Sequence, residues 1–445
     1  MVLEVIKIAL EANANFQYSV LKKFEAQKMM DESIISGIEQ QRIDALLDAF
    51  ENGISGLQLI IQALDDPARS VRETAQWLLT ESQCEQAKQA LWDYLPYQYM
   101  QPLCTLHFLP EDSEHPDTKQ YWNWFLYGIN PPELTPFLYR CDYKLDYITL
   151  LSDGKTLITY TDRESTVYLW DCYNGKLKDA YTIGNWEDGV HVVVSSNGNY
   201  LIYNFDWTLM GYKLKKGVNE FDNFHGYHYR IPEPTALAIK ADYTLIAGGR
   251  GKVSSGDGDD PICVYQLNIT NEEFNANDVA RLQPCQRLQG HYSRVESLLL
   301  SPDETVLLSQ GRDRHNDSHH LWDTQTWQLI RTYETSSEWI ADCLGVRPNG
   351  QVLASGCRNH VAAVWDIHTD EVLCVLPGKA PTVLSADGRV LICCKDSGGL
   401  LVWDLETNAE ICSLAENATN IQPLLLSRDR QLLVVGIDDM IQVWA

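Results

Sequence analysis

Three groups of residues in this chain have the types that bind metals or perform catalysis, and each has a simpler explanation. The first is the loop 254–261, where Asp257, Asp259 and Asp260 stand among glycines and serines, as ligands of hard cations do. It lacks the regular alternation and the distal glutamate of a calcium-binding EF-hand loop. We therefore expect no metal site there and interpret the segment as an exposed acidic loop.

The second group lies in residues 312–323, a stretch that contains three histidines and two aspartates: His315, His319, His320, Asp313 and Asp317. Metal ligands must converge on one point, whereas His319 and His320 are neighbours on a predicted strand and face opposite ways. We interpret this stretch as an extended loop that leads into a strand.

The third group is a serine, a histidine and an aspartate, the residue types of a hydrolase triad: His291, Ser309 and Asp313. No G-x-S-x-G segment, which holds the nucleophile in many hydrolases, accompanies them. Residues 248–252 (GGRGK) also lack the serine or threonine that completes a phosphate-binding loop. We therefore expect no catalytic residues, no metal and no cofactor.

The elements that hold these residues form a repeat after residue 145. Each unit has two apolar runs separated by a polar turn, then a strand that ends in Trp-Asp or a relative of it. Successive ends are 42, 53, 57, 43, 38 and 41 residues apart, near the roughly 40 to 45 residues of a four-stranded propeller blade. The ends are Trp170-Asp171, Tyr212-Lys213, Tyr265-Gln266, Trp322-Asp323, Trp365-Asp366, Trp403-Asp404 and Trp444-Ala445.

This pattern resembles the WD-repeat family over about 300 residues, and the fullest match runs from Gly290-His291 to Trp322-Asp323. The resemblance implies a hydrogen-bonded structural relay of four residues in that blade: His291, Ser309, Asp313 and Trp322. It also implies a mainly β fold, a seven-bladed propeller that serves for binding rather than catalysis. Two blades, 192–214 and 237–267, lack Trp-Asp, and we count them because their apolar strands remain.

The last blade ends after its third strand, at IQVWA, so another segment must supply the fourth. An unpaired strand edge would invite aggregation. Residues 134–141 lie just before the first blade, where other blades have their outer strand. We therefore predict that 134–141 is the closing strand of a propeller that spans residues 134–445.

The first 95 residues are predicted to form an all-α domain. Within it, residues 56–80 read as a helix that ends near Leu64, a turn at Asp65-Asp66-Pro67, and a second helix. This segment resembles one HEAT repeat, and the resemblance implies that Asp66 (or Asp65) pairs with Arg72. An ordinary helical hairpin with a solvated Arg72 is the alternative.

Residues 96–133 are rich in aromatic residues and proline. We interpret them as an interdomain segment packed between the two domains, because an exposed linker would not carry so many aromatic side chains. An exposed aromatic patch that binds a partner is the alternative.

The composition limits the partners. With 35 basic and 61 acidic residues the formal net charge is −26, which repels nucleic acid and anionic membranes. The 12 cysteines show no C-x-x-C spacing, and the N-terminus does not resemble a secretion signal. We therefore expect a cytoplasmic protein with no nucleic-acid or membrane partner and with protein partners that the sequence does not identify; its oligomeric state is not predicted.

Two consecutive blades carry insertions between their second and third strands, at 250–261 and 312–319. In WD-repeat propellers these loops share one face, and loops on a rigid scaffold are where recognition sits. The candidate binding residues are Arg250, Lys252, Asp257, Arg312, Arg314 and His315. We predict a non-catalytic scaffold that bridges proteins through these loops and the helical domain. The alternative is an enzyme or a small-ligand-binding propeller that uses its central channel.

Overall fold

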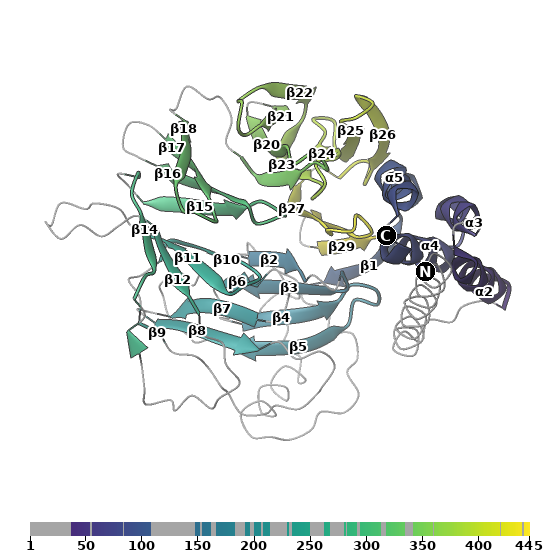
Figure 1. The fold of residues 1–445 in the computed structure, drawn as a ribbon, viewed down its shortest axis with the longest axis horizontal. Helices are drawn as coiled ribbons and strands as arrows, with labels where there is room; N and C mark the ends of the chain where they lie inside the picture. The colour runs from purple at the N-terminus through teal and green to yellow at the C-terminus, as the bar shows by residue number, and fades with distance from the viewer. Residues whose placement is uncertain are drawn as a thin grey trace, which may run out of the picture. The chain divides into compact units, whose positions relative to one another are not determined.

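The computed structural model of the protein divides the chain into two compact units, Met1–Pro96 and Tyr97–Ala445 (Figure 1). The residues that it describes are 37–53, 56–82, 84–107, 147–151, 154–161, 166–182, 192–195, 200–205, 208–213, 229–230, 234–249, 262–267, 280–281, 283–291, 294–312, 317–333, 341–358, 360–418, 420–437 and 440–445.

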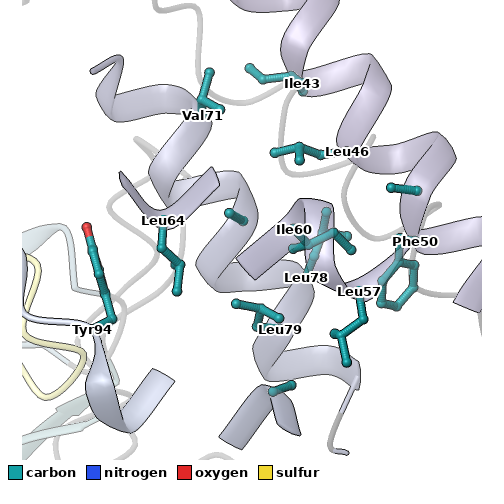
Figure 2. Packing of buried hydrophobic residues seen from close by; sticks show 13 residues of the cluster. Ile43, Leu46, Phe50, Leu57, Ile60, Leu64, Val71, Leu78, Leu79 and Tyr94 are labelled. Carbon is teal, nitrogen blue, oxygen red and sulfur yellow. The ribbon is translucent and has the colours of Figure 1, made fainter. Parts of the chain in front are cut away.

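The first unit is helical, as the sequence predicts. Its elements are α2 (Gly37–Glu51), α3 (Leu57–Gln62), the 3-10 helix η2 (Ala63–Asp65), α4 (Arg69–Ser82) and α5 (Glu85–Asp93). Figure 2 shows the side chains of these helices meeting in one apolar core. Ile60, Val71 and Leu78 are almost fully buried in this core, so burial of one apolar face accounts for the helix pair predicted at 56–80.

The turn between η2 and α4 is held by side chains. The Asp66 carboxylate accepts a hydrogen bond from the Ala68 amide at 2.8 Å and forms an ion pair with Arg42 of α2 at 2.9 Å. Arg72, which is buried, donates to the backbone carbonyls of Asp66 and Pro67 at 2.9 and 3.0 Å. Arg72 thus binds the main-chain carbonyl of Asp66. The expected ion pair between the side chains of Arg72 and Asp66 is replaced by one between Arg42 and Asp66.

The second unit contains six sheets of four antiparallel strands each, which are regular propeller blades (Figure 1). The first three in chain order are β2 (Tyr147–Leu150), β3 (Thr156–Thr161), β4 (Thr166–Asp171) and β5 (Leu177–Thr182); β10 (Ala236–Ile239), β11 (Thr244–Gly248), β12 (Ile262–Gln266) and β14 (Gln286–Leu288); and β15 (Val295–Leu300), β16 (Val306–Arg312), β17 (Asp317–Asp323) and β18 (Leu329–Tyr333).

The other three regular blades follow near the C-terminus. They are β19 (Cys343–Val346), β20 (Val352–Arg358), β21 (Val361–Asp366) and β22 (Val372–Pro377); β23 (Lys379–Leu384), β24 (Val390–Cys394), β25 (Leu400–Asp404) and β26 (Ala409–Leu414); and β27 (Ile421–Leu426), β28 (Leu433–Ile437) and β29 (Met440–Trp444) with β1 (Pro102–His107).

The remaining sheet departs from the prediction of seven like blades. It has five strands: β6 (Val192–Val194), β7 (Tyr200–Phe205), β8 (Thr208–Lys213), β9 (Tyr229–Arg230) and β13 (Ala280–Arg281). β13 comes from the segment between β12 and β14 and pairs in parallel with the two-residue β9. The structure therefore shows six regular blades, because a strand from the next blade is added beyond the short outer strand of this sheet.

The prediction for the closing strand is wrong. β29 pairs with β28 on one edge and with β1 on the other, with Leu106 opposite Ile441. Both edges of β29 are therefore filled, which excludes the predicted pairing of residues 134–141; these residues lie outside the described part of the chain. We inferred 134–141 because it lies close in sequence to the first blade. A strand farther back in the chain can close the propeller as well, because lengthening the connection adds little to the entropic cost of closing the loop. Residues 97–107 thus belong to the second unit.

Short polar side chains shape the turns of the blades. Ser301, Ser385 and Ser427 each donate to the aspartate two residues later, at 2.6, 2.5 and 2.5 Å. The aspartate of each Trp-Asp pair accepts backbone amides of the next turn, as Asp323 does from Gln325 and Thr326. Hydrogen bonds from Thr326 lower the pKa of Asp323, so the carboxylate is ionised and caps the turn at neutral pH.

Neighbouring blades pack face to face through apolar side chains. Leu308 and Leu321 meet Ala354 and Trp365 of the next blade. At the closure, Leu106 of β1 shares a core with residues of the first and last blades: Leu157, Trp170, Val434, Ile441 and Val443. The closing strand therefore also completes the core of the first blade.

We predict that residues 97–445 fold without the helical unit and that residues 108–445 do not, since they lack β1. Leu106→Ala should lower the free energy of unfolding by about 2–4 kcal/mol, because it opens a cavity in this core. Leu103→Ala, on the exposed side of the same strand, should change it by less than about 0.5 kcal/mol. Thermal and urea unfolding measure both effects. A 108–445 fragment that melts as cooperatively as 97–445 would contradict this account of closure.

Candidate functional site

The blade β15–β18 contains a buried chain of hydrogen bonds. Ser309 Oγ on β16 lies 2.7 Å from His291 Nε2, and Trp322 Nε1 on β17 donates to the same oxygen at 2.9 Å. The structure thus brings together three of the four relay residues implied by the sequence. The fourth, Asp313, lies outside the described residues. The relay links the segment before β15 to the two central strands of the blade.

Burial controls the chemistry of this relay. Ser309 is 0% exposed and His291 is 4% exposed, so no substrate carbonyl can reach the serine oxygen. Burial, together with the neighbouring imidazoles of His320 and His319, lowers the pKa of His291 to about 3. The histidine is therefore neutral at physiological pH, and the Ser-His pair acts as a structural link rather than as a nucleophile and base.

His319 and His320 point to opposite faces of β17, as the sequence predicts. The ring of His320 lies 4.2 Å from that of His291, and its Nδ1 is 3.0 Å from Thr332 Oγ1. His319 lies on the other face and lines a cavity of about 20 Å³ with Tyr333 and Trp365. Among the described residues, no group of three histidines, cysteines or carboxylates is arranged to hold a metal ion.

The sequence-based prediction missed one residue that has the same role as Ser309. In the blade β2–β5, Trp170 Nε1 donates to Thr159 Oγ1 at 2.9 Å. Thr159 stands 11 residues before its tryptophan on the second strand, close to the 13 residues that separate Ser309 from Trp322. A hydroxyl residue on the second strand, 11 to 13 residues before the tryptophan, is the signal that identifies it.

The relay lies at the end of the blade from which the insertion after β16 leaves. A Cβ on Gly311 would come within 2.7 Å of His291 Nδ1, so the imidazole packs directly on this strand end. Val295 is paired with Gly311, and its amide donates to the carbonyl of Gly249 in the preceding blade at 3.0 Å. Gly249 is the residue before the insertion 250–261. The bases of the two insertions are therefore adjacent at the same end of neighbouring blades.

Most candidate binding residues lie beyond these bases. Arg312 is the last residue of β16, and its backbone is paired with Asp317. The other five lie outside the described residues: Arg250, Lys252, Asp257, Arg314 and His315. The structure thus places the two ends of each loop and leaves the grouping of the side chains as a prediction.

Four cysteine thiols in the described part of the propeller show no sign of activation. Cys357, Cys374, Cys393 and Cys394 lie near one another on β20, β22 and β24, and all four are free. Burial raises the pKa of each, to about 11 for Cys394. They are therefore protonated at neutral pH, the form that neither binds metals nor attacks electrophiles.

The family model described as WD domain, G-beta repeat, matches the chain at residues 282–316 and 327–366. The first range contains β14 to β16 with the relay residues His291 and Ser309, and the second contains β18 to β21. None of the described helices has the length and apolar character needed to cross a membrane.

Ser309→Ala should lower the free energy of unfolding by about 1–3 kcal/mol, because it leaves His291 and Trp322 without their shared buried partner. Gln325→Ala, at an exposed position of the same blade, should change it by less than about 0.5 kcal/mol. Urea unfolding of both variants measures the difference. Equal effects would show that the relay contributes nothing specific to stability.

The stability should fall as the pH decreases from about 6.5 towards 3. In this window the unfolded chain protonates His291, while the folded protein keeps it neutral because its pKa is lowered to about 3. One proton taken up on unfolding gives a slope of up to about 1.4 kcal/mol per pH unit. His291→Gln should show a shallower dependence than wild type in urea unfolding between pH 4.5 and 7.5; identical slopes would contradict the assignment.

Proposed function

Since the chain is a WD-repeat β-propeller, we propose that it is a non-catalytic scaffold that bridges protein partners. WD-repeat propellers generally act as platforms for protein interaction. We also propose that the five-stranded sheet β6–β9 with β13 is the seventh blade of the ring. Its support is the core that Ile202 shares with Ile239 and Leu245 of the next blade.

The observation that carries the proposal is the adjacency of the two insertion bases. The hydrogen bond from the Val295 amide to the Gly249 carbonyl joins neighbouring blades at the point where both loops leave. Thr235 adds a second link, since its hydroxyl donates to the carbonyl of Val295 at 2.6 Å. Two loops that leave a rigid, cross-linked base side by side are suited to form one recognition surface.

We further propose that this surface binds an acidic region of a partner. The two loops bring four cationic residues to a protein of net charge −26, Arg250, Lys252, Arg312 and Arg314, and His315 adds a histidine beside them. A basic patch on an acidic body steers a partner of opposite charge, and such binding weakens as salt increases. Asp257 and the neighbouring aspartates reduce the net charge of the loops, which favours a weak interaction.

The helical unit is proposed as the second binding site. Its α3–η2–α4 hairpin has the aspartate turn and the buried arginine, Arg72, that we expect of a HEAT-like repeat. Repeats of this type stack their helices and leave their outer surfaces for partners.

The loop surface is tested with the triple variant Arg250→Glu, Arg312→Glu and Arg314→Glu. We expect it to lose the partners that wild type captures from its native host, with a melting temperature within about 2 °C of wild type. The matched control reverses three exposed cations elsewhere on the propeller, Lys176, Arg287 and Arg428, and should capture as wild type does.

Capture with the separate units, 1–96 and 97–445, tests the bridging. A scaffold that joins two partners should divide its captured proteins between the two fragments. If the triple variant captures the same proteins as wild type, and fragment 97–445 captures none, the loops are not the binding site.

A further inference from the structure

Exposed apolar side chains on the second unit gather on the outer strands of two neighbouring blades. Among the described residues of this unit, every large exposed apolar side chain except Leu103 lies on β18 or β22. They are Leu329 and Ile330 on β18 and Val372, Leu373 and Val375 on β22. Apolar side chains that gather in this way indicate a binding surface rather than ordinary surface variation.

The strand register shows which of these side chains face the space between the two blades. Val375 is paired with Ala363, and Val372 is paired with Trp365. Ala363 belongs to the core shared with the blade β15–β18, so Val375, which is 54% exposed, projects on that side. Val372, 45% exposed, lies on the same strand beyond the bulge between Val364 and Trp365. The wall that β22 presents to β18 is therefore apolar and open to solvent.

The opposite wall is formed by β18. Tyr333 is paired with His319 and lies in the same core, while the Arg331 guanidinium stands 5.2 Å from the centre of the Tyr333 ring. Arg331 also donates to the carbonyl of His368 in the next blade at 2.7 Å. We call the surface formed by Arg331, Tyr333, Val372 and Val375 the rim groove; Tyr333 also lines a small cavity together with Trp365 and Asp370.

A buried donor in this groove has no partner. The Tyr333 hydroxyl is buried and, within the described part of the chain, makes no hydrogen bond. Burial raises the pKa of Tyr333 to about 12, so the hydroxyl keeps its proton. It adjoins the cavity of about 20 Å³, which has room for one small polar group. A small polar side chain of an entering peptide would satisfy this donor.

The edge of β22 favours an extended occupant. β22 is an end strand, and no described strand pairs with its outer edge. It carries no charged residue (VLCVLP), a property that it shares with β1 (PLCTLH), whereas β5, β14, β18 and β26 each carry at least one. Charged residues protect edge strands from pairing with other chains, and their absence leaves this edge able to accept an added strand.

The negative charge at one end of the groove indicates which charge a bound segment should carry there. The turn that leads into β22 carries three carboxylates, Asp366, Asp370 and Glu371, against the single cation Arg331. Asp370 and Arg331 are 3.9 Å apart and both are partly exposed. The end of the groove therefore has a net negative charge, and a basic group complements it.

We propose that the rim groove binds an extended apolar segment of a partner protein that carries basic residues at the end nearest the Asp366–Glu371 turn. The segment adds a strand to the edge of β22, places apolar side chains on Val372 and Val375, and brings a small polar side chain to the Tyr333 hydroxyl. The groove is formed by residues of β18 and β22, whereas the loop surface proposed above is formed by the insertions after β11 and β16.

The test uses the full chain and a fluorescent peptide with two lysines followed by alternating valine and threonine, measured by fluorescence anisotropy. Val375→Lys, which replaces an apolar contact by a repelling charge, should weaken binding at least about tenfold. Ala409→Lys adds the same charge at an exposed position of the neighbouring outer strand β26 and should bind within about twofold of wild type. Tyr333→Phe should weaken binding by up to about tenfold while the protein stays folded.

A peptide with two glutamates in place of the lysines should bind at least about tenfold more weakly than the lysine peptide. Wild type that binds neither peptide, or binds both equally, overturns the proposal, as does Val375→Lys that binds like wild type. Light scattering excludes a second copy as the occupant: a dimer that forms in wild type and is lost in Val375→Lys overturns the peptide assignment. The loop triple variant should bind the lysine peptide normally, so failure of one proposal leaves the other intact.

Discussion

The propeller depends on one strand pairing between distant parts of the chain, that of β1 with β29. The backbone groups of Gln101 and Ala445 continue it with two further hydrogen bonds of 3.1 and 3.0 Å. The pairing removes the free edge of the last blade and seats Leu106 in the core between the first and last blades. Tyr97, just before β1, is fully buried, so the segment that closes the ring is also anchored ahead of the strand. In the other five regular blades the outer strand follows the third strand along the chain.

Polar side chains give the blades the rigidity that a binding platform needs. Ser309 joins His291 to Trp322, and Asp323 fixes the following turn through backbone amides. A buried donor or acceptor left unpaired costs free energy, so such links hold one geometry at the blade ends. The links from Thr235 and Val295 to the adjacent blade extend this rigidity across two blades. The loops therefore leave from a base that is held in place.

The proposed binding surfaces differ in chemistry because they lie at different places on the blades. The loop surface is rich in cations and suits an acidic partner, while the rim groove is apolar with carboxylates at one end. Blades that pack tightly near their inner strands leave β18 and β22 only partly covered. Two sites of opposite preference allow a scaffold to hold two kinds of partner without competition.

The sequence by itself determined the elements whose causes are local. The alternation of apolar residues, the turn aspartates and the Trp-Asp ends predicted the strands, and residues 56–80 predicted their helix pair. The match to the WD-repeat pattern also predicted that His291, Ser309 and Trp322 meet. Tertiary structure decided which strand fills the edge of β29, that β13 joins the sheet of β9, and that Arg42 pairs with Asp66. These choices depend on which strand lies beside a free edge, and which charged side chain lies beside a charge, in the folded protein. Residue spacing along the chain does not encode those spatial distances.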